Sequence, residues 1–171
     1  MLLLSGQTSR GFRLPSEAEW EYACRAGTRT PFHTGTRINT KQANFDDHLN
    51  YNGSAQVKYQ EKTLAVGAFP PNAFGLYDMH GNVWELCQDK WHDNYQNAPS
   101  NGSSWENEED NARVLRGGSW HSYPGGLRSS ERFYCNPDDR FYDTGFRVLC
   151  SSPSNSGSLA RWPLKRWFAV H

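Results

Sequence analysis

The stretch from Arg116 to Arg147 constrains the fold of this chain most strongly. It opens with Arg-Gly-Gly-Ser-Trp at 116–120 and closes with Gly-Phe-Arg at 145–147. Between these motifs, Tyr, Phe, Asp, Ser, Gly and His are abundant. The two ends predict buried scaffold, whereas the middle has the composition of an exposed surface. We therefore expect a fixed frame that presents a surface with few internal constraints.

The size and composition of the chain set broad limits on its class. Its 171 residues fit one domain with a core of its own. With 18 basic and 18 acidic residues, it offers no argument for nucleic acid or an anionic membrane as partner. Seven Trp, eight Tyr and nine Phe in a chain of mean hydropathy −0.83 predict loop-rich structure. Aromatic residues fill space in such structure and also serve binding surfaces.

The N-terminus and the apolar runs suggest a soluble, cytoplasmic protein. Residues 1–4 are too short for a signal-peptide core and lack a basic start. No run approaches the ~20 apolar residues of a membrane span.

The four cysteines are widely spaced and form no Cys-x-x-Cys pair, so a zinc site is not expected. We expect Cys24, Cys87 and Cys150 to be buried free thiols. Cys135 stands among polar and aromatic residues, and we expect it to be exposed.

Local signals predict one helix, at about 16–26. Ser16 and Glu19 form a capping box at its start, and Gly27 ends it. Short strands are predicted at 66–71, 83–86, 114–115 and 146–149, with polar loops at 28–62 and 92–112. Residues 151–171 are predicted to be a flexible linker and a basic aromatic tail, which either docks on the domain or a partner or is poorly ordered.

Four motifs together resemble one known family. They are Arg-Leu-Pro-Ser-Glu-Ala-Glu-Trp-Glu-Tyr-Ala at 13–23, Asn-Ala-Phe-Gly-Leu-Tyr at 72–77, Gly-Asn-Val-Trp-Glu at 81–85, and the pair at 116–120 and 145–147. In this order they resemble the formylglycine-generating-enzyme (sulfatase-modifying factor) domain over about residues 11–150. The resemblance implies a C-type-lectin-like α+β fold with small twisted antiparallel sheets, one or two helices and much irregular loop. Residues 1–150 would form this domain, with a variable region at about 116–150.

The catalytic chemistry of that family does not transfer directly. Its formylglycine-forming members are copper-dependent oxidases with two cysteines shortly after the Gly-Gly-Ser motif. The matching positions here hold Ser122 and Leu127, which cannot supply a thiolate to Cu(I). The related iron-dependent sulfoxide synthases use histidines from an additional helical domain, and the six histidines here show no matching spacing. His80 is expected to be a structural hydrogen-bonding residue. A metal-dependent oxidoreductase of either type is the alternative function.

A second branch of the fold is more similar, namely the variable proteins of diversity-generating retroelements. In these proteins adenines of a template RNA are replaced at random, so AAC codons become codons that end in C. Such codons cannot encode Trp, Met, Lys, Gln or Glu. Within 121–143 only Glu131 lies outside the allowed set. The layout agrees, because variable-looking groups alternate with fixed-looking residues, namely Pro124, Arg128, Arg132, Pro137 and Arg140.

This resemblance implies a non-catalytic ligand-binding protein with a diversified surface at 121–143 and no redox cofactor. Its partner would be an unknown protein or other macromolecule, and not nucleic acid. The aromatic residues of the stretch suit a paratope, although each could instead belong to the core. The arginines at 128, 132, 140 and 147 are expected to be internal braces. The predicted ligand-binding residues are His121, Ser122, Tyr123, Gly125, Gly126, Phe133, Tyr134, Cys135, Asn136, Asp139, Phe141, Tyr142 and Asp143.

The enzyme family also implies a structural calcium ion at the Gly-Asn-x-Trp-Glu turn. The matching positions are the side chains of Asp78 and Glu85 and the carbonyls of Gly81 and Val83, all oxygen donors suited to calcium. A second family site would begin at Asn44, but no acidic partner for it is evident.

Overall fold

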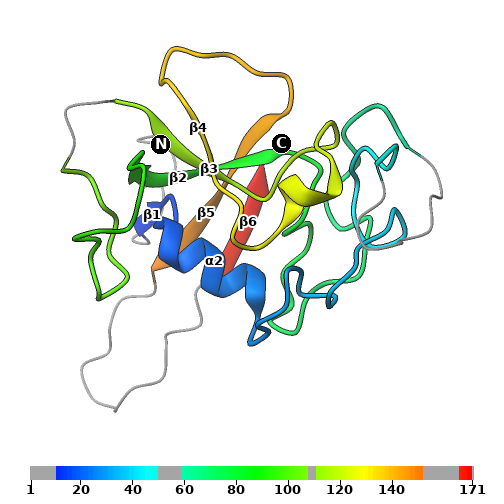
Figure 1. Cartoon of the computed structure of the whole chain (residues 1–171). Coiled ribbons are helices and arrows are strands. Elements are labelled where there is room, and N and C mark those ends of the chain that lie inside the picture. Colours follow the sequence, from blue (N-terminus) through cyan, green and yellow to red (C-terminus); the bar gives the residue numbers. More distant parts are fainter. Residues whose placement is uncertain (1–10, 50–58, 108–110, 152–165, 171) are drawn as a thin grey trace.

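A computed structural model describes residues 11–49, 59–107, 111–151 and 166–170 (Figure 1). In the described part, one α-helix lies against a six-stranded sheet, and long irregular segments make up the rest. The elements in chain order are β1 (Gly11–Arg13), α2 (Glu17–Arg25), β2 (Trp84–Lys90), β3 (Arg113–Arg116), the 3₁₀ helix η1 (Pro124–Leu127), β4 (Phe133–Cys135), β5 (Thr144–Ser151) and β6 (Arg166–Val170). This is the α+β, C-type-lectin-like fold that the motifs predicted.

The sheet has the strand order β1-β5-β2-β3-β4, and β6 also pairs with β5. All ladders are antiparallel except the one between β2 and β5, so the sheet is mixed. The parallel pair places Glu85 of β2 beside Gly145 of β5. Two of the family-like motifs, 81–85 and 145–147, therefore meet at the centre of the sheet.

The end of the chain contributes to this sheet. Leu149 and Cys150 of β5 pair with both β1 and β6, so these two strands lie on opposite edges of β5. Residues 166–170 of the tail therefore dock on the domain, as one of the two alternatives for the tail expected. The predicted linker at 151–158 begins at Ser151, which is instead the last residue of β5, and the rest of the linker lies outside the described residues.

Helix α2 begins and ends as the sequence predicted. The Ser16 side chain accepts a hydrogen bond from Glu19 N, and the Glu19 carboxylate accepts one from Ser16 N, which completes the capping box. Ala26 takes a left-handed backbone conformation at the C-terminal end, followed by Gly27. Trp20, on the buried face of the helix, is fully covered.

The strand predictions were mostly confirmed. Those at 83–86, 114–115 and 146–149 fall in β2, β3 and β5, which extend further than the patterns indicated. The strand predicted at 66–71 is wrong, because this segment forms turns. Gly67 has a positive φ of 84° and donates its N–H to the Asp78 carboxylate, so this part of the chain bends. The loops at 28–62 and 92–112 are irregular wherever the structure describes them.

The core has two apolar clusters. One joins α2 to the sheet and contains Trp20, Ala23, Cys24, Met79, Cys87 and Val114. The other lies under the loops and contains Phe32, Ile38, Ala43, Phe45 and Leu127. The predicted buried thiols Cys24, Cys87 and Cys150 are confirmed, and all four cysteines are free. The expected exposure of Cys135 is wrong, because β4 seats it against Arg113 of β3, where only 8% of it is exposed.

A buried ion pair connects the helix, the sheet and the motifs. Arg147 donates to both oxygens of the Glu85 carboxylate, at 2.5 and 2.6 Å, and each side chain is 2% exposed. Trp20 Nε1 donates to the same carboxylate at 2.6 Å, and Arg147 also reaches the carbonyl of Tyr77. Burial alone would lower the pKa of Arg147, but the Glu85 carboxylate raises it, so the guanidinium stays charged.

We expect Glu85→Gln to lower the free energy of unfolding by about 3–5 kcal/mol, because it leaves the Arg147 guanidinium buried without a counter-charge. Urea unfolding measures this loss. Glu131→Gln is the matched control: its partner Arg128 is 43% exposed, and exposed pairs contribute at most about 1 kcal/mol. Equal losses in the two variants would contradict the central role of the Glu85 pair.

His80 has the structural role that the sequence indicated. It is 3% exposed; its Nδ1 lies 2.7 Å from the carbonyl of Leu127, and its Nε2 accepts the backbone N–H of His33 at 3.1 Å. The neutral ring therefore carries its proton on Nδ1. A second proton, on Nε2, would point at the backbone N–H of His33, which is itself a donor. Burial, with the neighbouring His33 ring, lowers the pKa of His80 to about 3.

Acid should destabilise the fold through His80. Its folded pKa lies below its ordinary value of 6.5, so its contribution is complete above pH 6.5 and is lost as the pH falls toward 3. At pH 4.5 the loss should reach about 3 kcal/mol. The measurement is urea unfolding of the wild type and of His80→Gln, which does not titrate, at pH 7.5 and 4.5. An identical pH dependence in both proteins would refute the assignment.

Candidate binding surface

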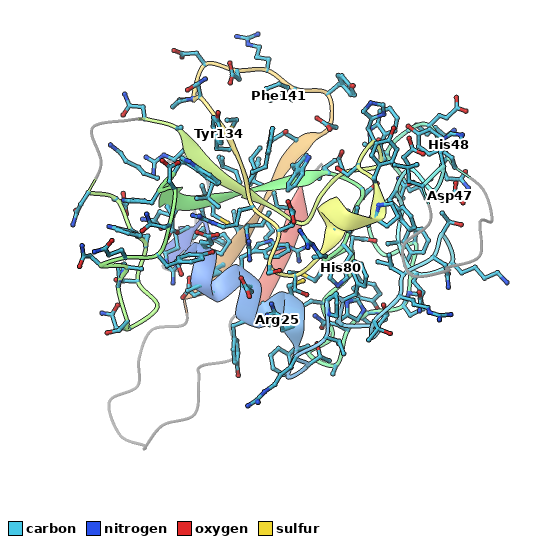
Figure 2. All side chains as sticks on the ribbon, in the orientation of Figure 1. Arg25, Asp47, His48, His80, Tyr134 and Phe141 are labelled. Atoms are coloured by element: carbon cyan, nitrogen blue, oxygen red, sulfur yellow. The ribbon has the colours of Figure 1, made fainter. Side chains whose placement is uncertain are left out.

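Residues 121–143 lie at one end of the sheet, on η1, on β4 and on the loop that connects β4 to β5 (Figure 1). Figure 2 labels Tyr134 and Phe141 on the two limbs of this β4–β5 region. The aromatic side chains of the stretch are between 47% and 73% exposed, so the alternative that they form core is wrong. The exposed members of the predicted ligand-binding set are His121, Tyr123, Phe133, Tyr134, Asn136, Asp139, Phe141 and Tyr142.

The remaining members of that set are tied to the frame. Ser122, Gly125, Gly126 and Asp143 are half-buried, and Cys135 is buried. The Ser122 hydroxyl accepts the backbone N–H of Ser119 at 3.0 Å, and the Ser119 hydroxyl donates to the Asp143 carboxylate at 2.7 Å. These side chains therefore hold the local backbone, whatever contacts they make with a ligand.

The exposed rings continue into aromatic residues outside the stretch. We call this set the aromatic band, and it consists of Tyr59, Trp84, Trp91, Trp120, Phe133, Tyr134 and Tyr142. Neighbouring rings have centroids between 5.0 and 6.0 Å apart along the series Trp91–Tyr134–Phe133–Trp84 and along Tyr142–Trp120–Tyr59. A hollow of about 190 Å³, lined by Trp84, Phe133 and Tyr142 among others, joins the two series.

Sequence reasoning missed the band members that precede residue 121. Trp84 and Trp120 belong to the motifs at 81–85 and 116–120, which were assigned to the scaffold alone. A signal was available for Trp84, because side chains alternate between the two faces of a strand, so Trp84 and Glu85 of the predicted strand at 83–86 could not face the same side. In the structure both rings are only half-buried.

Two arginines, Arg116 and Arg132, bind residues of the 121–143 stretch to the rest of the domain. Arg116 is fully buried, pairs with Glu21, and donates to the backbone carbonyls of Ser129 and Glu131 at 2.7 and 2.5 Å. Arg132 donates to the Glu17 carboxylate at 2.6 Å and to the carbonyl of His92 at 2.8 Å. These bonds fix the chain between η1 and β4.

The predicted internal braces are confirmed for Arg132 and Arg147, whereas Arg128 pairs with Glu131 but is itself 43% exposed. The prediction is wrong for Arg140, which is exposed and makes no ion pair with the part of the chain that the structure describes. Glu131, the one residue outside the codon set, pairs with Arg128. It is therefore a bracing residue and not part of the exposed surface.

The space around two glycines differs between the motif at 116–120 and the predicted binding surface. Gly118, at the end of β3, has a φ of 75°, and a Cβ there would lie 2.9 Å from the carbonyl oxygen of Gly126. A Cβ on Gly125 would meet nothing within 4 Å, and its φ is not positive. Gly118 of the Gly-Gly-Ser motif thus tolerates no side chain, whereas Gly125, which was predicted to bind ligand, does.

We expect Gly118→Ala to cost at least about 2 kcal/mol of unfolding free energy, from left-handed strain and overlap. Gly125→Ala should change it by no more than about 0.5 kcal/mol, as at an ordinary surface position. Thermal and urea unfolding of both variants measure this difference. Comparable losses would mean that the 121–143 stretch is as constrained as its frame.

The residues predicted to hold calcium are only partly available to a cation. Both Glu85 oxygens accept hydrogen bonds from Arg147, and one also accepts from Trp20. An Asp78 oxygen accepts the N–H of Gly67. A calcium ion at Glu85 would have to displace a buried guanidinium of the same charge sign, so these residues do not fit the ion as arranged. Calcium at Asp78, Gly81, Val83 and Glu85 stays a prediction, and binding would require Arg147 to release the Glu85 carboxylate.

The positions that match the copper cysteines are occupied differently. Ser122 is bonded to Ser119, and Leu127 is fully buried in the cluster with Phe32 and Phe45. Leu127 thus serves as core at the point where the oxidases carry a thiol. Within the described residues, no group of three or more His, Cys, Asp or Glu side chains is arranged to hold a metal ion.

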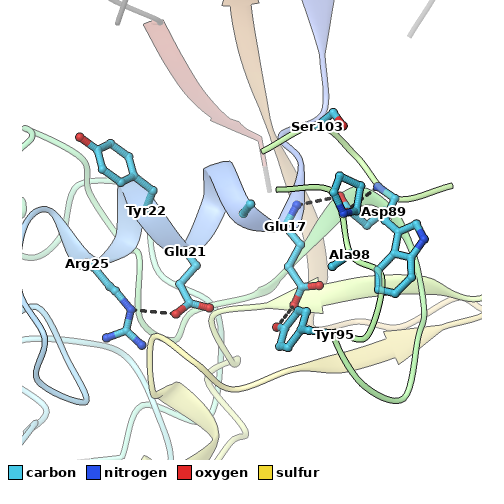
Figure 3. A pocket seen from close by; sticks show the side chains of 11 residues that line it. Glu17, Glu21, Tyr22, Arg25, Asp89, Tyr95, Ala98 and Ser103 are labelled. Atoms are coloured by element: carbon cyan, nitrogen blue, oxygen red, sulfur yellow. Dashed lines mark hydrogen bonds and ion pairs between the residues drawn. The ribbon is translucent and has the colours of Figure 1, made fainter. Parts of the chain in front are cut away.

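A second hollow, of about 370 Å³, lies beside α2, and none of the residues that line it belongs to the 121–143 stretch (Figure 3). Its acidic residues are already engaged: Glu17 accepts from Tyr95 and Arg132, Glu21 pairs with Arg25, and Asp89 accepts the N–H of Glu17. Burial raises the pKa of Asp89 above its ordinary value, and raises that of Tyr95 to about 12. This hollow belongs to the ion-pair network of the frame.

Fold and surface together define a C-type-lectin-like domain that carries an exposed aromatic band on an arginine-braced frame. Comparison with known proteins assigns the family: residues 4–152 match the sulfatase-modifying factor enzyme 1-like domain, and the chain belongs to this family. No helix among the described residues is both long and apolar enough to cross a membrane.

Relatives of several kinds are similar to this chain. The formylglycine-generating enzyme of Thermomonospora curvata is 36% identical over 155 residues, which cover 82% of this chain and 50% of its own length. Serine/threonine-protein kinase pkn1 of Chlamydia pneumoniae is 37% identical over 80% of this chain but only 20% of its own. The chain thus spans half or less of the length of these relatives.

Solved structures show the same fold. PvdO from Pseudomonas aeruginosa has a TM-score of 0.70 and 39% identity, over 86% of this chain and 55% of its own. Treponema denticola variable protein 1 has a TM-score of 0.62 and 34% identity, over 84% of this chain and 49% of its own. The resemblance to both branches of the fold, enzymes and variable proteins, is therefore confirmed.

Proposed function

We propose that this chain is a non-catalytic ligand-binding protein whose exposed residues between 121 and 143 contact a protein or other macromolecular partner. One observation carries the proposal: exposed aromatic side chains stand on both sides of a short segment, residues 129–132, that Arg116 and Arg132 hold to the rest of the domain. Large rigid side chains on a fixed backbone give contact area at low entropic cost.

The form of the surface favours a macromolecule over a small metabolite. The hollow in the aromatic band measures about 190 Å³, below the ~300–1,000 Å³ typical of small-molecule sites. The band extends well beyond it on both sides, from Trp91 to Tyr59. Exposed apolar patches of this kind mark interaction sites. A formal net charge of zero gives no support to nucleic acid as the partner.

The similarity to Treponema denticola variable protein 1 supports a diversified surface. Under this proposal, the DNA near the gene should hold a near-copy of the segment that encodes 116–150, differing at adenines, beside a reverse transcriptase gene. A cytoplasmic location is part of the proposal, because all four cysteines are free thiols and disulfides are rare in reducing compartments.

The alternative function is a metal-dependent oxidoreductase, which the similarity to formylglycine-generating enzymes favours. Against it stand Ser122 and the buried Leu127 at the positions of the copper thiols. The family also includes a bovine relative that is named an inactive formylglycine-generating enzyme, 31% identical over 88% of this chain. Stoichiometric binding of copper or iron, with oxygen consumed in the presence of a thiol peptide, would establish the alternative.

We expect the exposed surface to accept new side chains without loss of the fold. The variant with Tyr123→Ser, Phe133→Ser, Phe141→Ser and Tyr142→Ser should lose no more than about 0.5 kcal/mol for each substitution. A display library randomised at the exposed positions of 121–143 should yield folded binders to an unrelated protein such as hen lysozyme. Unfolding curves and binding titrations measure the two outcomes.

A matched library at exposed positions of α2 and its neighbouring loop, such as Ala18 and Tyr22, controls for the display format. It should yield fewer and weaker binders, because that face lacks the aromatic band. A 121–143 library that mostly unfolds, or that performs no better than the control, would contradict the proposal.

A further inference from the structure

The hollow in the aromatic band has a definite chemical preference. Its walls are the rings of Trp84, Phe133, Phe141 and Tyr142, contributed by β2, β4 and the β4–β5 loop. Trp84 and Phe133 are stacked, with centroids 5.5 Å apart and planes 29° apart. Ring faces carry the negative part of the aromatic quadrupole, so such walls attract a cation.

Asp143 adds a formal negative charge to this hollow. It is the ionisable acidic side chain among the lining residues, and no Lys, Arg or His lines the hollow with it. The β4–β5 loop also carries Asp138 and Asp139 against the single positive charge of Arg140. Both the walls and the surrounding loop therefore favour a positively charged ligand group and disfavour an anion.

The Asp143 carboxylate is held in place before any ligand arrives. Its Oδ2 accepts the hydroxyl of Ser119 at 2.7 Å, and its backbone carbonyl accepts the N–H of Trp84 at 2.8 Å. Its other oxygen, Oδ1, accepts no hydrogen bond from the residues that the structure describes. A fixed carboxylate that lines an aromatic hollow and has one oxygen without a hydrogen bond from the described residues is a preorganised acceptor for a charged donor.

Resting on the proposed function, we propose that this hollow receives an arginine side chain of a protein partner. The volume of about 190 Å³ fits one side chain rather than a whole small molecule. A guanidinium is planar, so it stacks on ring faces while its edge donates to a carboxylate, whereas an ammonium is a compact and more strongly hydrated charge. The rest of the aromatic band then contacts the residues that flank the arginine.

The test is selection of a displayed library of random dodecapeptides on the whole chain, followed by titration of the synthetic peptides. Peptides that bind the wild type but not the Phe133→Ser, Phe141→Ser double variant define the surface-dependent set. We expect these peptides to contain arginine, and Arg→Ala in the peptide to weaken binding at least tenfold. Asp143→Asn should also weaken binding at least tenfold, although its amide oxygen can still accept from Ser119.

Two controls separate the charge effect from structural damage. Glu106→Gln removes a negative charge from the exposed part of the 92–112 loop and should leave peptide affinity unchanged. The melting temperature of Asp143→Asn shows whether its loss of binding is local. A peptide with Arg→Lys should bind several-fold more weakly, because the ammonium cannot stack.

The outcomes are distinguishable. Surface-dependent peptides with Leu or Phe anchors, indifferent to Asp143→Asn, would overturn the arginine assignment and leave the proposed function standing. Equal affinity of the Lys and Arg peptides would overturn the preference for a guanidinium and leave a general cation site. If no peptide depends on Phe133 and Phe141, both this inference and the proposed binding function fail.

Discussion

The rest of the structure depends on the interactions of one buried carboxylate, that of Glu85. It accepts from Arg147 of β5 and from Trp20 of α2, and it lies on β2 at the centre of the sheet. A buried pair of this kind contributes less by its own energy than by the cost of breaking it, since either partner alone would be an uncompensated charge. It therefore fixes which strands and which helix face meet, in a domain with little regular secondary structure.

Arginine recurs in this frame because loop-rich chains leave many backbone carbonyls unpaired. Arg116 and Arg132 each bind a carboxylate and also donate to carbonyls of irregular segments. One guanidinium can thus replace several ladder hydrogen bonds that a longer strand would supply. The segment between η1 and β4 is held in this way, and the exposed aromatic side chains stand on the elements before and after it.

The same division explains how one fold can serve enzymes and binding proteins. Leu127 turns inward and completes an apolar cluster, while Tyr123 and Tyr142 turn outward. Chemistry on this fold requires ligands or nucleophiles at particular positions of the segment, whereas binding requires only that the backbone stay fixed when side chains change. A side chain can be added at Gly125, which has open space around it, but not at Gly118, where a Cβ would overlap the backbone.

Much of this architecture was determined by the sequence itself, through local signals that need no distant partner. The capping box at Ser16 and Glu19 set the helix, and the buried residues Arg116, Ser119 and Arg147 of the two motifs marked the ends of the surface segment. The expectation that the second motif is buried throughout was wrong, because Phe146 is 37% exposed. What only the tertiary structure decided depends on contacts between residues far apart in the chain. The parallel pairing of β2 with β5 brought Trp84 beside Asp143, and the pairing of β3 with both β2 and β4 brought Phe133 near Trp84. Pairing of β4 with β3 also covered Cys135, and the turn at Gly67 replaced a strand. Periodicity and motif spacing carry no record of these long-range contacts, because each side chain's exposure is set by whichever segment packs over it.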